Sequence, residues 1–317
     1  MSTKTFYHSK FPIIAGALFI LFSFSSCKKN HSNPPPVSGN ITAIVSNTPE
    51  FSILKAAVVK AGLTATLSGK GPFTVFAPNN DAFMASGITL ASINSLSADD
   101  LKAILLYHTI GASVKAMDVP AGPNAAVATV GGDSVFLTKN LNGVFVNGVP
   151  VVKADIIATN GIIHVISRVL MPPPGNIVEV AQSDSTFSYL VAAVLRASQG
   201  NTNVAQVLSS NGPFTVFAPT NNAFRNAGFA TINDINNADP NTLATILTYH
   251  VISGRIFSSD LSDGAQPTTL NGGQVTIGLI NGATVKGSSN TTLSNIINTN
   301  IVATNGVVHV IDQVLLP

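Results

Sequence analysis

Histidine is the residue type in this sequence best suited to acid–base chemistry, because its ordinary pKa lies near neutrality. Four of the six histidines recur in pairs: His108 and His250 each follow a tyrosine. His164 and His309 each follow two β-branched residues. A histidine beside an acid such as Asp118 could activate a hydroxyl group. The chain contains no G-x-S-x-G, H-E-x-x-H, P-loop or G-x-G-x-x-G pattern, however, so the sequence predicts a protein that is not an enzyme.

Metal-ligating residues are also sparse. The triplets 79–81 and 220–222 are rich in asparagine, but an oxygen cage for a cation needs more charge than the single Asp81 supplies. Cys27 is the only cysteine of the chain, so no thiolate cluster can form. We therefore expect neither a metal ion nor a cofactor.

Structural roles explain the same histidines more simply. His164 shares a strand face with Ile162 and Ile166, which predicts a hydrogen-bonded core residue. His108 follows the last turn of a predicted helix, where a ring N–H can pair with the unpaired helix carbonyls. The matching histidines of the second half are interpreted in the same way.

The first part of each half has helical periodicity. Thr48 with Pro49 predicts an N-cap and first helical position before residues 51–61, and Ser185 opens the matching helix. Ser97 and Asp239 are the predicted N-caps of a later helix in each half.

Short apolar runs separated by Asn-Gly pairs follow these helices, and they predict hairpins of an antiparallel sheet, because both residues accept positive φ. The pairs are Asn142-Gly143, Asn147-Gly148, Asn160-Gly161, Asn271-Gly272, Asn281-Gly282 and Asn305-Gly306. Each half is therefore predicted to be an α+β domain.

An internal repeat sets the architecture. Residues 71–83 and 212–224 are identical at 11 of 13 positions, and 158–170 matches 303–315 in the same order. In the first pair of segments, Phe73 and Phe214 are expected in buried strands that end at Pro78 and Pro219. The repeat unit of roughly 140 residues is a normal domain size. We expect domains at 37–171 and 176–317, joined by a linker at 172–175.

The N-terminus reads as a secretory signal. Residues 11–24 form an apolar run that is too short to span a bilayer as a helix, and Lys4 and Lys10 precede it. The run ends in two serines followed by Cys27, which resembles a bacterial lipobox. We expect residues 1–26 to be a signal peptide, Cys27 to carry a lipid anchor in the membrane, and residues 27–36 to be a Pro-rich tether. An ordinary secreted protein with one thiol is the alternative.

Removal of the predicted signal peptide changes the net charge of the protein, and the residue after Cys27 indicates its location. Removing two lysines from 16 basic residues leaves 14, against 14 acidic ones, and no basic cluster remains beyond Lys29. Nucleic-acid binding needs a concentrated basic face, so none is predicted. Lys28 stands where an inner-membrane retention signal would place aspartate, which favours the outer membrane of the cell envelope.

These motifs together resemble the fasciclin (FAS1) family: Phe-Thr-Val-Phe-Ala-Pro, a central Tyr-His, and Asn-Gly followed by two β-branched residues and His-Val-Ile, all present twice. The resemblance covers nearly the whole chain after the tether. It implies a wedge-shaped β-sandwich with small helices, and extracellular adhesion without an agreed catalytic activity.

The resemblance also implies partner contacts, because Tyr-His and an Asp-Ile upstream of the second box have been proposed as such in animal members. The matching residues here are Tyr107, His108, Tyr249, His250, Asp155 and Ile156. Asn300 replaces the aspartate in the second repeat, so that half departs from the pattern.

The predicted function is adhesion to a protein or polysaccharide of the envelope or the extracellular space. The alternative is a small-molecule or glycan binding protein with a cleft at the domain joint.

Overall fold

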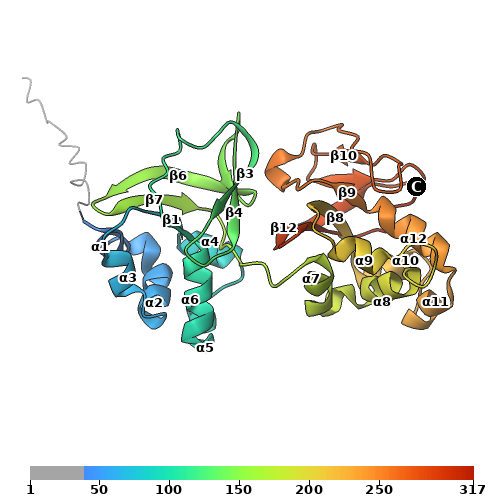
Figure 1. Cartoon of the computed structure of the whole chain (residues 1–317), viewed down its shortest axis with the longest axis horizontal. Helices are drawn as coiled ribbons and strands as arrows, with labels where there is room; N and C mark the ends of the chain where they lie inside the picture. Colours follow the sequence, from blue (N-terminus) through green and yellow to red (C-terminus); the bar gives the residue numbers. More distant parts are fainter. Residues whose placement is uncertain (1–38) are drawn as a thin grey trace, which may run out of the picture. The chain divides into compact units, whose positions relative to one another are not determined.

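The computed structural model describes residues 39–317, which form two repeats of a helical layer covering one face of a sheet (Figure 1). The predicted signal peptide, the Cys27 anchor and the tether at 27–36 lie outside the described residues. Within residues 39–317, no helix is both long enough and apolar enough to cross a membrane.

The first repeat begins with short helices and ends with most of its strands. Its helices are α1 (Ile41–Asn47), the 3-10 turn η1 (Pro49–Phe51), α2 (Ser52–Lys60), α3 (Thr64–Ser68), α4 (Asn80–Ala85), α5 (Leu90–Ser95) and α6 (Ala98–Tyr107). Its strands are β1 (Phe73–Pro78), β2 (Thr109–Ile110), β3 (Gly122–Ala128), β4 (Ser134–Asn140), β5 (Gly143–Val146), β6 (Val149–Ala158) and β7 (Gly161–Ile166).

The second repeat follows the same order. Its helices are α7 (Ile177–Ser183), η2 (Ser185–Phe187), α8 (Ser188–Ala197), α9 (Val204–Ser209), α10 (Asn221–Asn226), α11 (Ile232–Asn237), α12 (Pro240–Tyr249) and the turn η3 (Ser258–Asp260). Its strands are β8 (Phe214–Pro219), β9 (Val251–Ser253), β10 (Thr276–Gly278), β11 (Thr284–Lys286), β12 (Ser294–Ala303) and β13 (Gly306–Ile311). The α+β prediction is confirmed.

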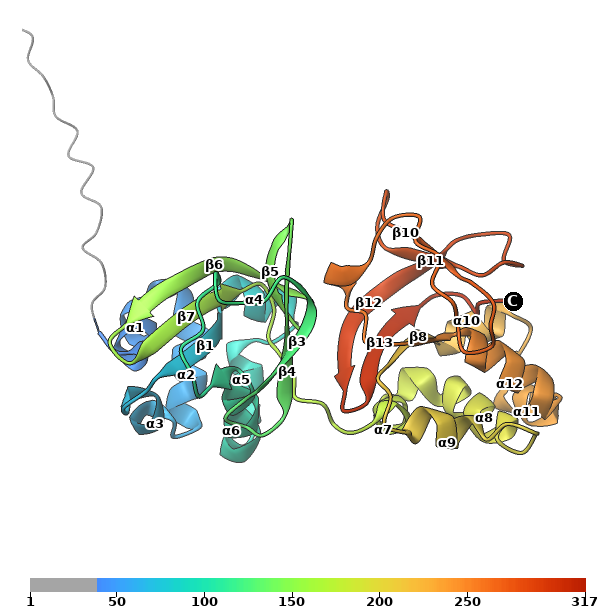
Figure 2. The same cartoon turned by 45° about the horizontal axis from the view of Figure 1, so that its top comes forward.

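The two sheets share a central arrangement. The strand order is β2-β1-β7-β6-β5-β4-β3 in the first and β10-β11-β12-β13-β8-β9 in the second. Most neighbours are antiparallel, as predicted, but β1 pairs with β7 in parallel, and β8 pairs with β13 in the same way. Figure 2 shows β12, β13 and β8 side by side. Within the first repeat, the repeated segments 71–83 and 158–170 therefore contain neighbouring strands, and so do 212–224 and 303–315 in the second. Local sequence patterns do not reveal this pairing.

Each of these central strands packs on both faces. Val75 and Ala77 of β1 belong to the core under the helices, and Phe73 packs against it. Phe76 points to the other face and joins a second core with Val135 and the inner strands. The predicted buried strand is confirmed, and its side chains alternate between two cores. In β8, Phe217 likewise joins a separate core with Val275 and Ile277.

The helix N-caps agree with the sequence at most positions. Ser97 Oγ accepts a hydrogen bond from Asp100 N at 3.0 Å, and Asp239 Oδ1 accepts one from Thr242 N at 2.8 Å. Asn79 caps α4 in the same way. The predictions at Ser97 and Asp239 are confirmed, because a short polar side chain pairs an otherwise unpaired helix N–H.

Thr48 takes the predicted N-cap position and Pro49 the first helical position, but of the 3-10 turn η1 that leads into α2. The Thr48 hydroxyl donates back to Ile44 O at 2.7 Å and pairs no N–H of the turn, so only the position is confirmed. In the first turn of α2, Asn80 Oδ1 accepts from Ile53 N at 3.2 Å. Ser185 likewise starts the turn η2 rather than α8, and Asn221 caps α8 through Tyr189 N.

The six Asn-Gly pairs all lie at turns, but the expected positive φ at both residues occurs only at Asn147 (φ 50°) and Gly148 (φ 73°). At the other five pairs the asparagine does not have positive φ, so they do not form the expected type I′ turn.

Candidate functional site

The Tyr-His pair closes α6 inside the first repeat. Tyr107 is buried, its hydroxyl donates to Ser134 O at 3.2 Å and accepts from Asn147 Nδ2 at 2.9 Å. Burial raises the pKa of the tyrosine to about 12, so the hydroxyl stays protonated. The buried Tyr249 lies at the same point of the second repeat and pairs with Gln274 O.

The histidine after each tyrosine has both ring nitrogens paired. His108 Nδ1 lies 2.8 Å from Ile104 O and Nε2 accepts from Leu170 N at 2.9 Å, an arrangement that assigns the neutral tautomer with the proton on Nδ1. His250 repeats it with Ile246 O and Leu315 N, both at 2.8 Å. Burial lowers the pKa of each ring to about 4. Neither ring has an atom left for acid–base chemistry or for a ligand.

The strand histidines hold the loop that follows β2 or β9. His164 Nε2 donates to Val114 O at 2.8 Å, and Nδ1 accepts from Asp155 N at 3.2 Å. In the second repeat, His309 makes the same contacts with Ile256 O and Asn300 N. Burial lowers the pKa of His309. These rings join the sheet to a surface loop.

Asp155 occupies a β-bulge of β6 with φ 58°. Its side chain is exposed, and Oδ1 accepts from Ala116 N at 3.0 Å. Asn300 of β12 has φ 64° and accepts from Ser258 N at 2.8 Å, so an amide serves the same purpose there. Ile156 packs partly against the helical core.

Of the six predicted partner contacts, the structure thus puts Asp155 at the surface, Ile156 halfway, and the two Tyr-His pairs inside. Contact of these residues with a partner stays a prediction.

The Asn-Gly turns before β7 and β13 have a structural role that the sequence did not predict. Asn160 Oδ1 accepts from Ile41 N at 2.9 Å, and Nδ2 donates to Leu67 O and Gly69 O, both at 2.9 Å. One side chain therefore joins the start of α1 to the end of α3. Gly161 follows because a Cβ there would lie 2.1 Å from Phe73 O. Asn305 repeats these bonds in the second repeat.

Arg255 marks the strongest difference between the repeats. Its side chain is 9% exposed, and Nη1 donates to Ala303 O at 3.0 Å and to Gly306 O, while Nη2 donates to Thr304 O at 3.2 Å. Burial lowers the pKa of the guanidinium to about 10, so it stays charged at neutral pH. Burying a cation is costly unless its N–H groups are paired, and here the three carbonyl groups provide that pairing beneath an apolar cover.

Phe136 of β4 in the first repeat provides that cover. Its ring centroid lies 4.1 Å from Arg255 Cζ and 5.9 Å from the ring of Phe257. Val302 and Val307 complete this apolar cluster.

Polar contacts surround it. Asn124 Nδ2 donates to Arg255 O at 2.5 Å, and Thr138 Oγ1 donates to Asp260 Oδ1 at 3.2 Å. Asn140 Nδ2 donates to Ser259 O at 3.0 Å. We call these contacts, together with the Phe136 cluster, the repeat contact.

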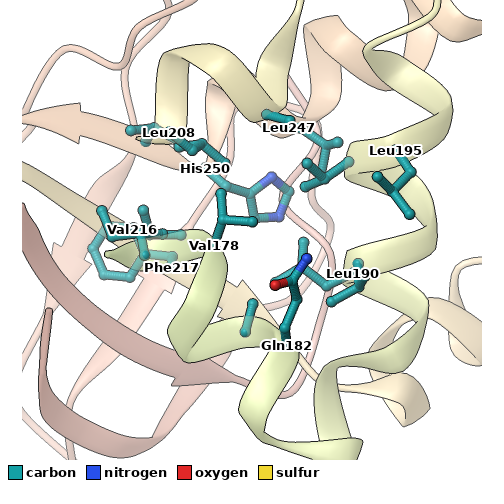
Figure 3. Close-up of a pocket in the computed structure, with 15 residues that line it drawn as sticks. Val178, Gln182, Leu190, Leu195, Leu208, Val216, Phe217, Leu247 and His250 are labelled. Atoms are coloured by element: carbon teal, nitrogen blue, oxygen red, sulfur yellow. The ribbon is translucent and has the colours of Figure 1, made fainter. Parts of the chain in front are cut away.

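Two pockets bear on small-molecule binding. One, of about 290 Å³, lies where the repeats meet and is lined on one side by Asn147 and Arg168 and on the other by residues 298–302. The second lies in the second repeat between α7, α8 and β8 and is almost wholly apolar, with Gln182 and His250 as its polar neighbours (Figure 3). Its volume of about 40 Å³ is well below the roughly 150 Å³ of a cavity that takes up benzene.

Potential metal-ligating side chains are scattered over the described part of the chain. Among residues 39–317, no cluster of three or more His, Cys, Asp or Glu side chains could hold a metal ion.

Comparison with known proteins identifies the family. The family model of the fasciclin domain matches residues 49–172 and 185–317. Transforming growth factor-beta-induced protein ig-h3 from Sus scrofa is 30% identical over 264 residues, covering 80% of this chain and 36% of that protein. Human periostin is 30% identical over 259 residues, covering 80% of this chain and 29% of its own. This chain therefore spans much less than two thirds of these relatives.

Other similar proteins are shorter. Protein sll1483 from Synechocystis is 39% identical over 176 residues, covering 55% of this chain and 91% of that protein. The solved FAS1 domain pair from the insect cell adhesion molecule Fasciclin I aligns with a TM-score of 0.41 at 20% identity, covering 86% of this chain and 94% of that one. The fasciclin domain model matches most of the chain in two places, which leads to one conclusion: the chain belongs to the fasciclin domain family.

Proposed function

We propose that this protein is an adhesion module of the cell envelope, anchored by a lipid on Cys27, whose two fasciclin domains bind a protein or polysaccharide partner. The presence of two fasciclin domains, a type of domain found in cell adhesion proteins, is the observation that carries the proposal. The outer membrane is the proposed location, since Lys28 follows the cysteine.

The chemistry of the described side chains supports binding over catalysis. The histidines that recur in both repeats donate and accept hydrogen bonds within the core. A general base must reach the proton that it removes, which these paired rings cannot do while the fold is intact. We therefore propose that the protein is not an enzyme.

The anchor leads to the first prediction. Cys27→Ala should abolish labelling by a fatty-acid probe and release the protein from the membrane fraction, because no other cysteine can be acylated. Cys27→Ser serves as the matched control for side-chain size. Labelling that persists in either variant would remove the lipid anchor from the proposal.

Capture of envelope components on immobilised residues 37–317 tests partner binding. A retained component that is absent from the heat-unfolded control supports the proposal. Retention by folded and unfolded protein alike would argue against it.

A second prediction concerns Asp155 in the same assay. Asp155→Asn should leave the melting temperature unchanged, because Asn300 makes the equivalent bond to Ser258 N in the second repeat. Loss of the charge should lower partner affinity several-fold if the carboxylate meets the partner. Asp155→Ala is the structural control, since it also removes the bond to Ala116 N. Unchanged affinity in both variants would move the contact surface away from β6.

The alternative function, a small-molecule or glycan binding protein, is favoured by the 290 Å³ pocket where the repeats meet. Arg168 and Asn298 line opposite sides of that pocket, so Arg168→Ala and Asn298→Ala test it. Equal loss of glycan binding in both variants would favour this alternative over a loop-based surface.

A further inference from the structure

In the repeat contact, β4 of the first repeat packs against residues 255–260 of the second, which we call the receiving surface. Because the sequence is repeated, the first repeat has a corresponding surface. Thr74 Oγ1 bonds Ala112 O and Val114 N, as Thr215 Oγ1 bonds Gly254 O and Ile256 N. These matching bonds align the loop 112–118 with 254–260. Ser113, Lys115, Met117 and Asp118 therefore stand where Arg255, Phe257, Ser259 and Asp260 form the repeat contact.

The opposite side of the contact is also duplicated. Tyr107 bonds Ser134 O and Tyr249 bonds Gln274 O, which aligns β4 with the segment 274–280. Phe136, Thr138 and Asn140 of the first repeat thus correspond to Thr276, Gly278 and Ile280.

In the second repeat the receiving surface is covered, and in the first it is open within residues 39–317. Val302 is 8% exposed beneath Phe136, whereas its counterpart Ile157 is 61% exposed. Ile157 and Lys115 line a hollow of about 710 Å³. Within residues 39–317, two surfaces, which we call the unused surfaces, therefore have no partner: the 113–118 loop with Ile157 in the first repeat, and the 276–280 segment, which corresponds to β4, in the second.

The unused surfaces carry complementary side chains. In the repeat contact, the Asn140 side chain donates to the main-chain carbonyl of Ser259. The corresponding residues of the unused surfaces are Ile280, 84% exposed, and Met117, 73% exposed. Both of these exposed side chains are apolar, so burying them against each other would be favourable.

Charge agrees with this pairing. Asp263 accepts a hydrogen bond from Leu279 N at 2.7 Å, which holds a carboxylate next to Ile280. Lys70 and Lys115 line the hollow of the first repeat. An acidic edge on one surface would meet a basic edge on the other.

We propose that a second copy of this chain docks its 276–280 segment against the 113–118 loop and Ile157 of the first, so that molecules associate head to tail. Such an interface joins two different surfaces and therefore generates open chains or rings rather than a symmetric dimer. It is weaker than the repeat contact, because Thr276 replaces the aromatic anchor Phe136. Self-association is separate from the proposed adhesion function, since the two use different partners.

Sedimentation velocity over about 1 to 500 μM tests the proposal, a range that brackets weak association. The protein used is residues 27–317 with Cys27→Ala. The average mass should rise with concentration, and Ile280→Lys or Met117→Lys should weaken the association at least tenfold. Val59→Lys, at a position 61% exposed on α2, should change nothing. Each variant is first shown to melt like the parent protein.

Mixing the two variants tests whether the association is head to tail. Ile280→Lys keeps a working receiving surface and Met117→Lys keeps a working 276–280 segment, so the mixture should form a 1:1 dimer that grows no further. A mass that is constant over the whole concentration range, or a mixture that stays monomeric, would overturn the proposal. So would a loss of association in only one of the two variants. Envelope capture by Ile280→Lys then reports adhesion to other partners independently.

Discussion

Lowering the pH from 6.5 to 4 should destabilise each repeat by roughly 3 kcal/mol, through His108 in the first and His250 in the second. Both pKa values fall from 6.5 to about 4 because burial disfavours the charged ring. The unfolded chain therefore binds a proton below about pH 6.5 that the folded chain does not take up until about pH 4. The contribution to stability is complete above pH 6.5 and decreases as the pH falls through this window.

Urea unfolding at several pH values measures this effect. His108→Asn removes this group from the first repeat. His250→Asn removes its counterpart from the second repeat, where His309, whose pKa is also lowered by burial, still titrates. Each variant should be less stable at pH 7 but should lose less further stability on acidification than the parent. A parent protein whose stability is flat between pH 6.5 and 4.5 would contradict the assignment of neutral buried rings.

Replacing Arg255 should produce the second large effect. Arg255→Ala is expected to destabilise the second repeat by about 2 to 4 kcal/mol, because three carbonyl contacts and the stacking on Phe136 are lost together. The repeat contact should weaken at the same time, so that the two repeats unfold in separate transitions.

Two further variants separate the contributions. Arg255→Met keeps the apolar stem and removes the charge, so it reports the carbonyl contacts. Phe136→Ala leaves those carbonyl contacts intact and removes the ring of the first repeat that covers the Arg255 guanidinium. Calorimetry should show closer transitions in the parent than in Phe136→Ala. Identical transitions in all of these proteins would mean that the repeat contact does not couple the repeats.

Much of the fold was predictable from the sequence because its signals are local. Ser97 and Asp239 cap helices as expected, and the alternation from Phe73 to Ala77 gave the two buried faces of β1. The family resemblance rested on segments that the structure places next to each other, β1 with β7 and β8 with β13.

The features that were not predicted depend on contacts between distant residues. Asn160 lies in a hairpin turn, as predicted, but its side chain also bonds Ile41 N, which is 119 positions away in the chain. Asn80 follows α2 in the sequence, yet its side chain accepts from Ile53 N in the first turn of that helix. Local propensity contains no information about such partners.

The site was predictable only in part. The structural interpretation of His164 follows from its apolar neighbours, and the ring is buried with both nitrogens paired. Arg255 gave no signal, because a single arginine in a polar loop normally lies in solvent. Comparing it with Ser113, its counterpart in the repeat, was the one available indication that the two domains differ there.

The central claim is that folded fasciclin domains bind a component of the cell envelope. Saturation binding of fluorescently labelled residues 37–317 to isolated envelope membranes tests it most directly. The account predicts binding that saturates, that unlabelled protein displaces, and that disappears when the protein is unfolded by heat. Binding that rises linearly without saturation, or that survives unfolding, would contradict the claim.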